Sequence, residues 1–186
     1  MKNTEYQYQQ GLTEIIKDLL VGKDVKTINL YGKNIGDMGA KYLAEAIKIN
    51  QSVTQINLKF NNIGAEGVKY FAEALKINQT VIHISLESNN IGDVGAKYLA
   101  EALRVNQTVT LIYLCENRIR DEWLNNIEET LDKNAKQQKL KQKQAEEKLK
   151  IELEVKIEEK VAGEFQKNIM NISQLIAEGN TKIQVD

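Results

Sequence analysis

Apolar residues in the first three quarters of the chain follow a motif that returns every 28 residues, as Leu30, Leu58 and Leu86 show. Near its start each copy has an isoleucine and a leucine separated by one residue, and this alternation is typical of a short strand with one buried face. Later in each copy, apolar residues recur at helical spacing, so that they fall on one arc of a helix. In the first copy these residues are Gly39, Ala40, Leu43, Ala46 and Ile47. Each copy therefore predicts a strand, a turn and a helix.

The repeat divides the chain into three predicted parts. Four copies occupy residues 25–134, beginning at Val25, Val53, Val81 and Val109. Residues 1–24 are predicted to form an N-terminal helical cap, because "GLTEIIKDLLVG" at 11–22 aligns with the helical half of a repeat. Residues 135–186 form a charged tail. One strand–helix unit cannot bury its apolar face alone, whereas stacked units bury one another, so the pattern predicts a solenoid.

Asparagine recurs at two places in the repeat. The first place follows the strand, at Asn61, Asn89 and Asn117, and has Lys33 in the first copy. We expect these side chains to point inward and to satisfy backbone groups of the turns. The second place ends the helix, in "NQS" or "NQT" at Asn50, Asn78 and Asn106. These tripeptides match glycosylation acceptors, but their recurrence favours a role in capping the turn into the next strand.

The second copy reads "VTQINLKFNNIGAEGVKYFAEALKINQT" and fits the pattern L-x-x-L-x-L-x-x-N-x-L at Val53, Ile56, Leu58, Asn61 and Ile63. On these residues the chain resembles leucine-rich-repeat proteins of the ribonuclease-inhibitor type, and its helical halves are similar to repeats of NOD-like receptors. The resemblance covers about residues 11–134. It implies an α/β solenoid with short parallel strands inside and helices outside. Because this fold hosts inhibitors, GTPase regulators, receptors and bacterial effectors, the resemblance does not choose among functions.

The tail carries two conflicting signals. Apolar residues alternate with a period of two at 149–157, which indicates a strand. The flanking Gln, Lys, Glu and Ala residues favour a helix, as does the helical spacing of Phe165, Ile169, Ile172 and Ile176. We interpret the tail as mostly helical, with a break near Gly163. Three roles stay open for it: a solvated stalk, a helix for self-association or docking, and a swapped or aggregating strand.

Composition excludes several classes of function. The net charge of −1 gives no reason to expect a nucleic-acid partner, and no apolar run approaches the length of a membrane span. The single histidine, His83, and the single cysteine, Cys115, cannot form a zinc site or an internal disulfide framework. We therefore expect no cofactor, no metal, no membrane partner and no catalysis. The expected location is cytoplasmic, with leaderless secretion as an effector the alternative.

The outward face of the predicted sheet is the candidate site. The buried positions barely change among the copies, whereas the outward positions differ from copy to copy. Many near-parallel side chains on a rigid concave sheet suit protein recognition. We predict a non-catalytic module that binds a protein of unknown identity; the alternative is a regulator of a target enzyme, resembling GTPase activators or the ribonuclease inhibitor. The predicted contact residues are Tyr31, Gln55, Asn57, Lys59, His83, Ser85, Glu87, Leu111 and Tyr113.

Overall fold

A computed structural model describes residues 12–182 of the chain. The chain divides after Lys139 into two compact units. In the first unit a helical stretch at 12–20 precedes the repeats, and part of the predicted cap at 1–24 lies outside the described residues. The division of the chain at residues 24 and 134 stays a prediction.

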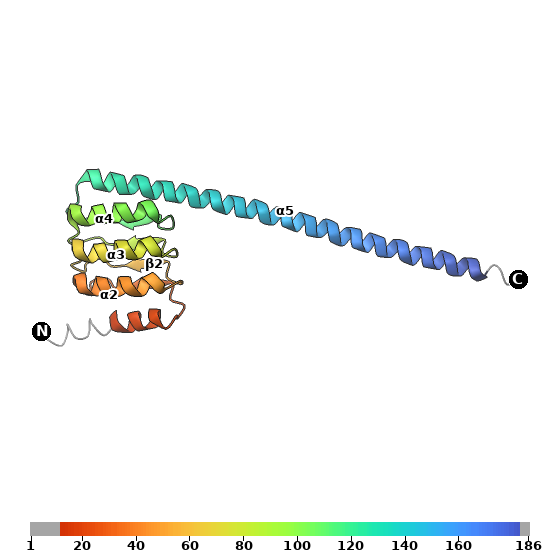
Figure 1. Cartoon of the computed structure of the whole chain (residues 1–186), viewed down its shortest axis with the longest axis horizontal. Coiled ribbons are helices and arrows are strands. Elements are labelled where there is room, and N and C mark those ends of the chain that lie inside the picture. The colour runs from red at the N-terminus through yellow and green to blue at the C-terminus, as the bar shows by residue number, and fades with distance from the viewer. Residues whose placement is uncertain (1–11, 183–186) are drawn as a thin grey trace. The chain divides into compact units, whose positions relative to one another are not determined.

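The first unit contains one parallel sheet, with four short strands in chain order. The strands are β1 (Thr27–Asn29), β2 (Gln55–Asn57), β3 (His83–Ser85) and β4 (Leu111–Tyr113). Three helices connect them: α2 (Gly36–Ile49), α3 (Ala65–Ile77) and α4 (Gly92–Val105). Figure 1 shows these helices stacked side by side. The predicted α/β solenoid is confirmed, with one strand and one helix in each repeat.

The core lies between the sheet and the helices. The central residues of the four strands pair in a single line, which is Ile28, Ile56, Ile84 and Ile112. Their side chains are buried, as are the leucines two residues further on and the apolar faces of the helices. Burying one such side chain contributes about 1.5–3 kcal/mol to stability. The repeated apolar pattern therefore supplies most of the stabilisation at each interface between repeats.

Small residues let neighbouring helices approach closely. A Cβ atom added to Gly67 of α3 would lie 3.0 Å from the Cα atom of Asp37 in α2, and one added to Gly95 would lie 3.3 Å from the Cα atom of Ala65. The Asp37 carboxylate also accepts a hydrogen bond from the Gly67 N–H, at 3.0 Å. The fourth repeat has the half-buried Trp123 at the equivalent position.

The first row of asparagines joins each turn to the next repeat, as predicted. Asn61 donates from Nδ2 to the carbonyl oxygen of Leu30, at 2.7 Å. Its Oδ1 accepts from the backbone N–H groups of Lys33 and Ile35. Asn89 bonds the second turn in the same way, from the third repeat. The first turn has no buried asparagine of its own, and Asn61 satisfies its backbone groups.

The second row of asparagines lies where each helix ends. Asn78 donates to the carbonyl oxygens of Ile47 and Asn50, both at 2.9 Å, and its Oδ1 accepts from the Val81 N–H. Asn106 repeats this arrangement one repeat later. These side chains are buried and fully engaged. This geometry confirms the capping interpretation of the "NQS" and "NQT" stretches.

The last helix, α5 (Asp121–Lys182), begins in the fourth repeat and continues through the tail. Ile127 and Leu131 of its first turns are buried, and Asn134 donates to the carbonyl oxygen of Asn106 at 2.8 Å. The predicted helix is confirmed, but the predicted break near Gly163 is wrong. A single glycine costs a helix interior only about 1 kcal/mol, and the surrounding residues are strong helix formers. Every residue from 140 to 179 is exposed.

Candidate functional site

The predicted contact residues lie on one surface, at the positions that flank the buried isoleucines and the buried leucines two residues further on. We call this surface the sheet face. The register places Thr27, Gln55, His83 and Leu111 in a first column, and Asn29, Asn57, Ser85 and Tyr113 in a second column. The third column consists of Tyr31, Lys59, Glu87 and Cys115. Backbone hydrogen bonds hold the third column together. The N–H group that follows each of its first three members donates to the carbonyl oxygen of the next member, at 2.9–3.1 Å.

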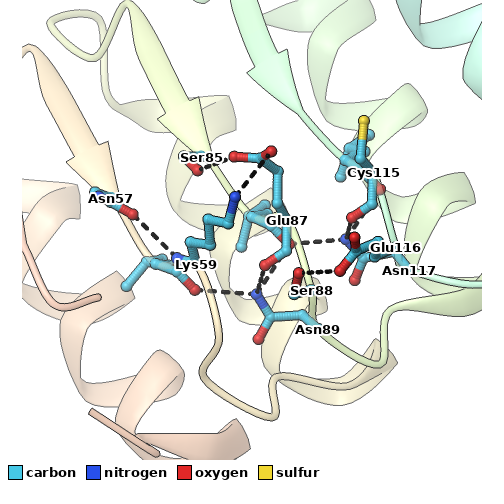
Figure 2. Close-up of polar contacts among 12 residues, drawn as sticks. Asn57, Lys59, Ser85, Glu87, Ser88, Asn89, Cys115, Glu116 and Asn117 are labelled. Carbon is cyan, nitrogen blue, oxygen red and sulfur yellow. Dashed lines mark hydrogen bonds and ion pairs between the residues drawn. The ribbon is translucent and has the colours of Figure 1, made fainter. Parts of the chain in front are cut away.

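A polar network occupies the middle of the sheet face (Figure 2). The Lys59 ammonium lies 3.3 Å from Oε1 of Glu87, and the Ser85 hydroxyl donates to Oε2 of the same carboxylate at 3.1 Å. The Asn57 side chain accepts from the Lys59 N–H. The Lys59 and Glu87 side chains are 32% and 25% exposed, so water screens their attraction and the pair contributes at most about 1 kcal/mol. The network instead fixes the positions of charged groups that a partner would meet.

Aromatic side chains stand beside this network. The rings of Tyr31 and Phe60 meet edge to face, with centroids 5.5 Å apart and an interplanar angle of 70°. The Lys59 ammonium lies 5.4 Å from the centroid of the Phe60 ring. Tyr31 and Phe60 are 52% and 46% exposed, and Tyr113 in the second column is 49% exposed. Tyrosine is enriched among the residues that carry most of the binding energy of protein interfaces.

Phe60 also belongs to this surface, but it is absent from the contact residues predicted from the sequence. It follows the strand, where the alternation of inward and outward side chains no longer predicts which way a side chain points. Its backbone has a φ of 59°, in the left-handed region, where bulky side chains are rare. The equivalent residues Gly32, Ser88 and Glu116 share this conformation. Alignment of the copies could have found Phe60, because this column varies as strongly as the three columns of the sheet face.

The single histidine and the single cysteine of the sequence lie in different columns of the sheet face. His83 is exposed in the first column, and Cys115 is an exposed free thiol in the third. Within residues 12–182, no group of three or more His, Cys, Asp or Glu side chains is arranged to hold a metal ion. In the same part of the chain, no helix combines the length and the apolar character needed to cross a membrane. The sheet face thus presents polar, charged and aromatic groups on a rigid support.

Comparisons with known proteins agree on the fold. The family described as "Leucine Rich repeat" matches residues 50–72 and 78–100. No curated protein matches the chain. A solved structure titled "Leiomodin-1 Actin-Binding Site 2" is similar, with a TM-score of 0.62 and 19% identity, over 73% of this chain and 95% of the other. The tropomodulin C-terminal domain from Caenorhabditis elegans has a TM-score of 0.50 and 14% identity, over 70% of this chain and 97% of the other.

These findings define the class of the molecule as an α/β solenoid followed by a long helix. The family model places leucine-rich repeats at residues 50–72 and 78–100 of this chain. Its repeats, each with a full helix, are compatible with the ribonuclease-inhibitor type.

Proposed function

We propose that the chain is a non-catalytic module that binds a protein partner through the sheet face. The observation that carries this proposal is the contrast between constant and variable positions. The central strand residues are isoleucine in all four repeats, whereas the first column of the sheet face reads Thr27, Gln55, His83 and Leu111. A scaffold kept constant under a varied surface suits recognition of a shaped partner.

The exposed aromatic groups support the same proposal. Tyr31, Phe60 and Tyr113 each expose about half of their surface, and a few large side chains usually carry most of the binding energy of an interface. The four strands are short, so the surface suits a small interface rather than an extended one. A change in the turnover of an enzyme partner would point to the alternative role, regulation of a target enzyme.

Actin is the first partner to test, because one similar solved domain carries "Actin-Binding Site" in its title. The same fold serves many partners, so the proposal of a sheet-face site does not depend on actin. An actin titration that shows no binding would remove this partner, and affinity capture followed by a titration would then supply another.

The proposal predicts which side chains matter. The double variant His83→Ala with Tyr113→Ala should weaken binding of the identified partner by roughly 30-fold, the equivalent of about 2 kcal/mol. Tyr42→Ala is the matched control, because Tyr42 is a similarly exposed tyrosine, at 54%, on helix α2. Calorimetric titration of the full chain would measure both. Loss of binding in Tyr42→Ala with no loss in the double variant would move the site to the helices.

A further inference from the structure

Helix α5 carries a stripe of mostly apolar residues that are exposed in the described part of the chain. Residues 140–179 are all exposed, and the large apolar members of the stripe are 43–66% exposed. The stripe steps alternately by four and three residues along the helix. We call it the seam, and it consists of Ile151, Val155, Glu158, Ala162, Phe165, Ile169, Ile172 and Ile176.

The seam has the period of a left-handed coiled coil. Steps of four and three residues average 3.5, and at roughly 100° per residue the whole seam falls within an arc of about 100°. A strict 3.5-residue repeat keeps its apolar residues facing a partner helix of the same period. The alternation with a period of two at 149–157 hides this repeat, because Leu149, Leu153 and Ile157 lie outside the seam.

We propose that two copies of the chain pair through the seam as an antiparallel coiled coil. In this register Ile151 faces Ile176 of the second copy, and Val155 faces Ile172. Phe165 faces Ala162, so that the largest side chain of the seam meets the smallest. Such alternation of large and small residues fills an interface without voids. A parallel pair would instead place two Phe165 rings in one layer and two Ala162 methyl groups in another.

Charge favours the same direction. Glu158 is the only charged residue of the seam, and a parallel pair would bury two copies of it in one layer, which like-charge repulsion disfavours. A parallel pair would also set Glu154 beside Glu159 of the second copy. In the antiparallel pair Glu158 faces Ile169. The antiparallel pair also sets the glutamates that flank the first half of the seam beside the second half of the other copy. The flanking positions of that second half are uncharged: Gln166, Asn168, Ser173 and Leu175.

The first test is the mass of the full chain in solution, and it does not depend on the proposed sheet-face function. The chain has a mass of 21.1 kDa, and sedimentation equilibrium at micromolar concentration should give twice this value. Ile169→Glu places a second carboxylate against Glu158 and should give the mass of a monomer. Leu153→Glu is the matched control on the other side of α5 and should leave the mass of two chains. A monomeric natural chain, a larger assembly, or equal dissociation by both variants would overturn the proposal.

The second test is the direction of pairing, measured by disulfide formation in a Cys115→Ser background. Chains that carry Ile151→Cys should form mixed disulfides with chains that carry Ile176→Cys. Ile176→Cys alone should form none, because the two thiols would lie at opposite ends of the seam, about 37 Å apart at 1.5 Å per residue. Disulfide-linked pairs of Ile176→Cys alone would show parallel pairing and would overturn the antiparallel register.

Discussion

At the scale of single residues, two rows of buried asparagine side chains join neighbouring repeats. The strands are only three residues long, so their own hydrogen bonds leave many turn groups without a backbone partner. An asparagine amide has two donors and a carbonyl acceptor, and Asn89 uses both kinds to bridge two turns. The repeated asparagines are therefore structural, and their burial excludes them from the sheet face.

Removal of one of these side chains should destabilise the repeats strongly. Asn89→Ala would leave the buried N–H groups of Asn61 and Ile63 without their acceptor, and each such loss costs about 1–3 kcal/mol. We expect a loss of about 3 kcal/mol or more in the free energy of unfolding, measured by urea titration. Asn90→Ala, one residue later at an exposed position, should change stability by less than about 0.5 kcal/mol. Equal effects of both would contradict the inward direction of Asn89.

The half-buried carboxylate of Asp93 gives the stability of the repeats a dependence on pH. The backbone N–H of Arg120 donates to Asp93 at 2.9 Å, and this bond, with the Arg120 guanidinium, lowers the pKa of Asp93 below its ordinary value of 3.8. Because the folded state has the lower pKa, this contribution is fully present above pH 3.8 and is lost as the pH falls through the folded value. The melting temperatures of the natural chain and Asp93→Asn should therefore converge on acidification. A difference that stays constant down to strongly acidic pH would contradict the assignment.

At the scale of the elements, close contacts between helices set the spacing of the stack. A methyl group on Gly67 would lie 2.5 Å from Oδ1 of Asp37 and 3.0 Å from its Cα atom. Gly67→Ala should therefore lower the free energy of unfolding of the repeats by about 1–3 kcal/mol. Fluorescence of Trp123, which packs against the core, would follow this unfolding.

Gly163→Ala is the matched control, because an added methyl group there meets nothing within 4 Å. The same substitution in α5 should leave the Trp123 transition unchanged while it increases helix content, since alanine is the better helix former. A Gly67→Ala variant as stable as the natural chain would show that α2 and α3 separate easily.

The elements predicted most accurately from the sequence are those that occur in every copy of the repeat. Ile56 and Leu58 occur in the same pattern in every copy, so the strands, their register and the buried face follow from internal comparison. Gly163 lies in the tail, which has no second copy for comparison. The free-energy cost of this glycine in a helix was smaller than the helix propensity of the residues around it. The direction of Phe60 depends on a left-handed backbone that no hydrophobic period encodes. The sequence was sufficient to predict the sheet face as a surface, whereas the contact between Tyr31 and Phe60 could be seen only in the structure.

At the scale of the whole molecule, the chain has two surfaces of different character. The sheet face is mixed, with polar, charged and aromatic groups on a rigid repeat scaffold. The seam is mostly apolar and lies on the part of helix α5 that belongs to the second unit. If both proposals hold, each assembly carries two sheet faces, and a partner with repeated sites would bind with higher avidity than a single domain allows. The repeats would supply recognition and α5 would supply valency.

Site-specific photo-crosslinking tests the central claim most directly, because it works whether or not the partner has been identified. A benzophenone amino acid would replace Tyr113 on the sheet face or Tyr42 on α2, two tyrosines of similar exposure. After irradiation with the candidate partner or a fractionated extract, mass spectrometry would identify the crosslinked proteins. We predict one specific partner trapped from position 113, competed away by the unlabelled chain, and none from position 42. Specific trapping from position 42, with none from position 113, would contradict the account.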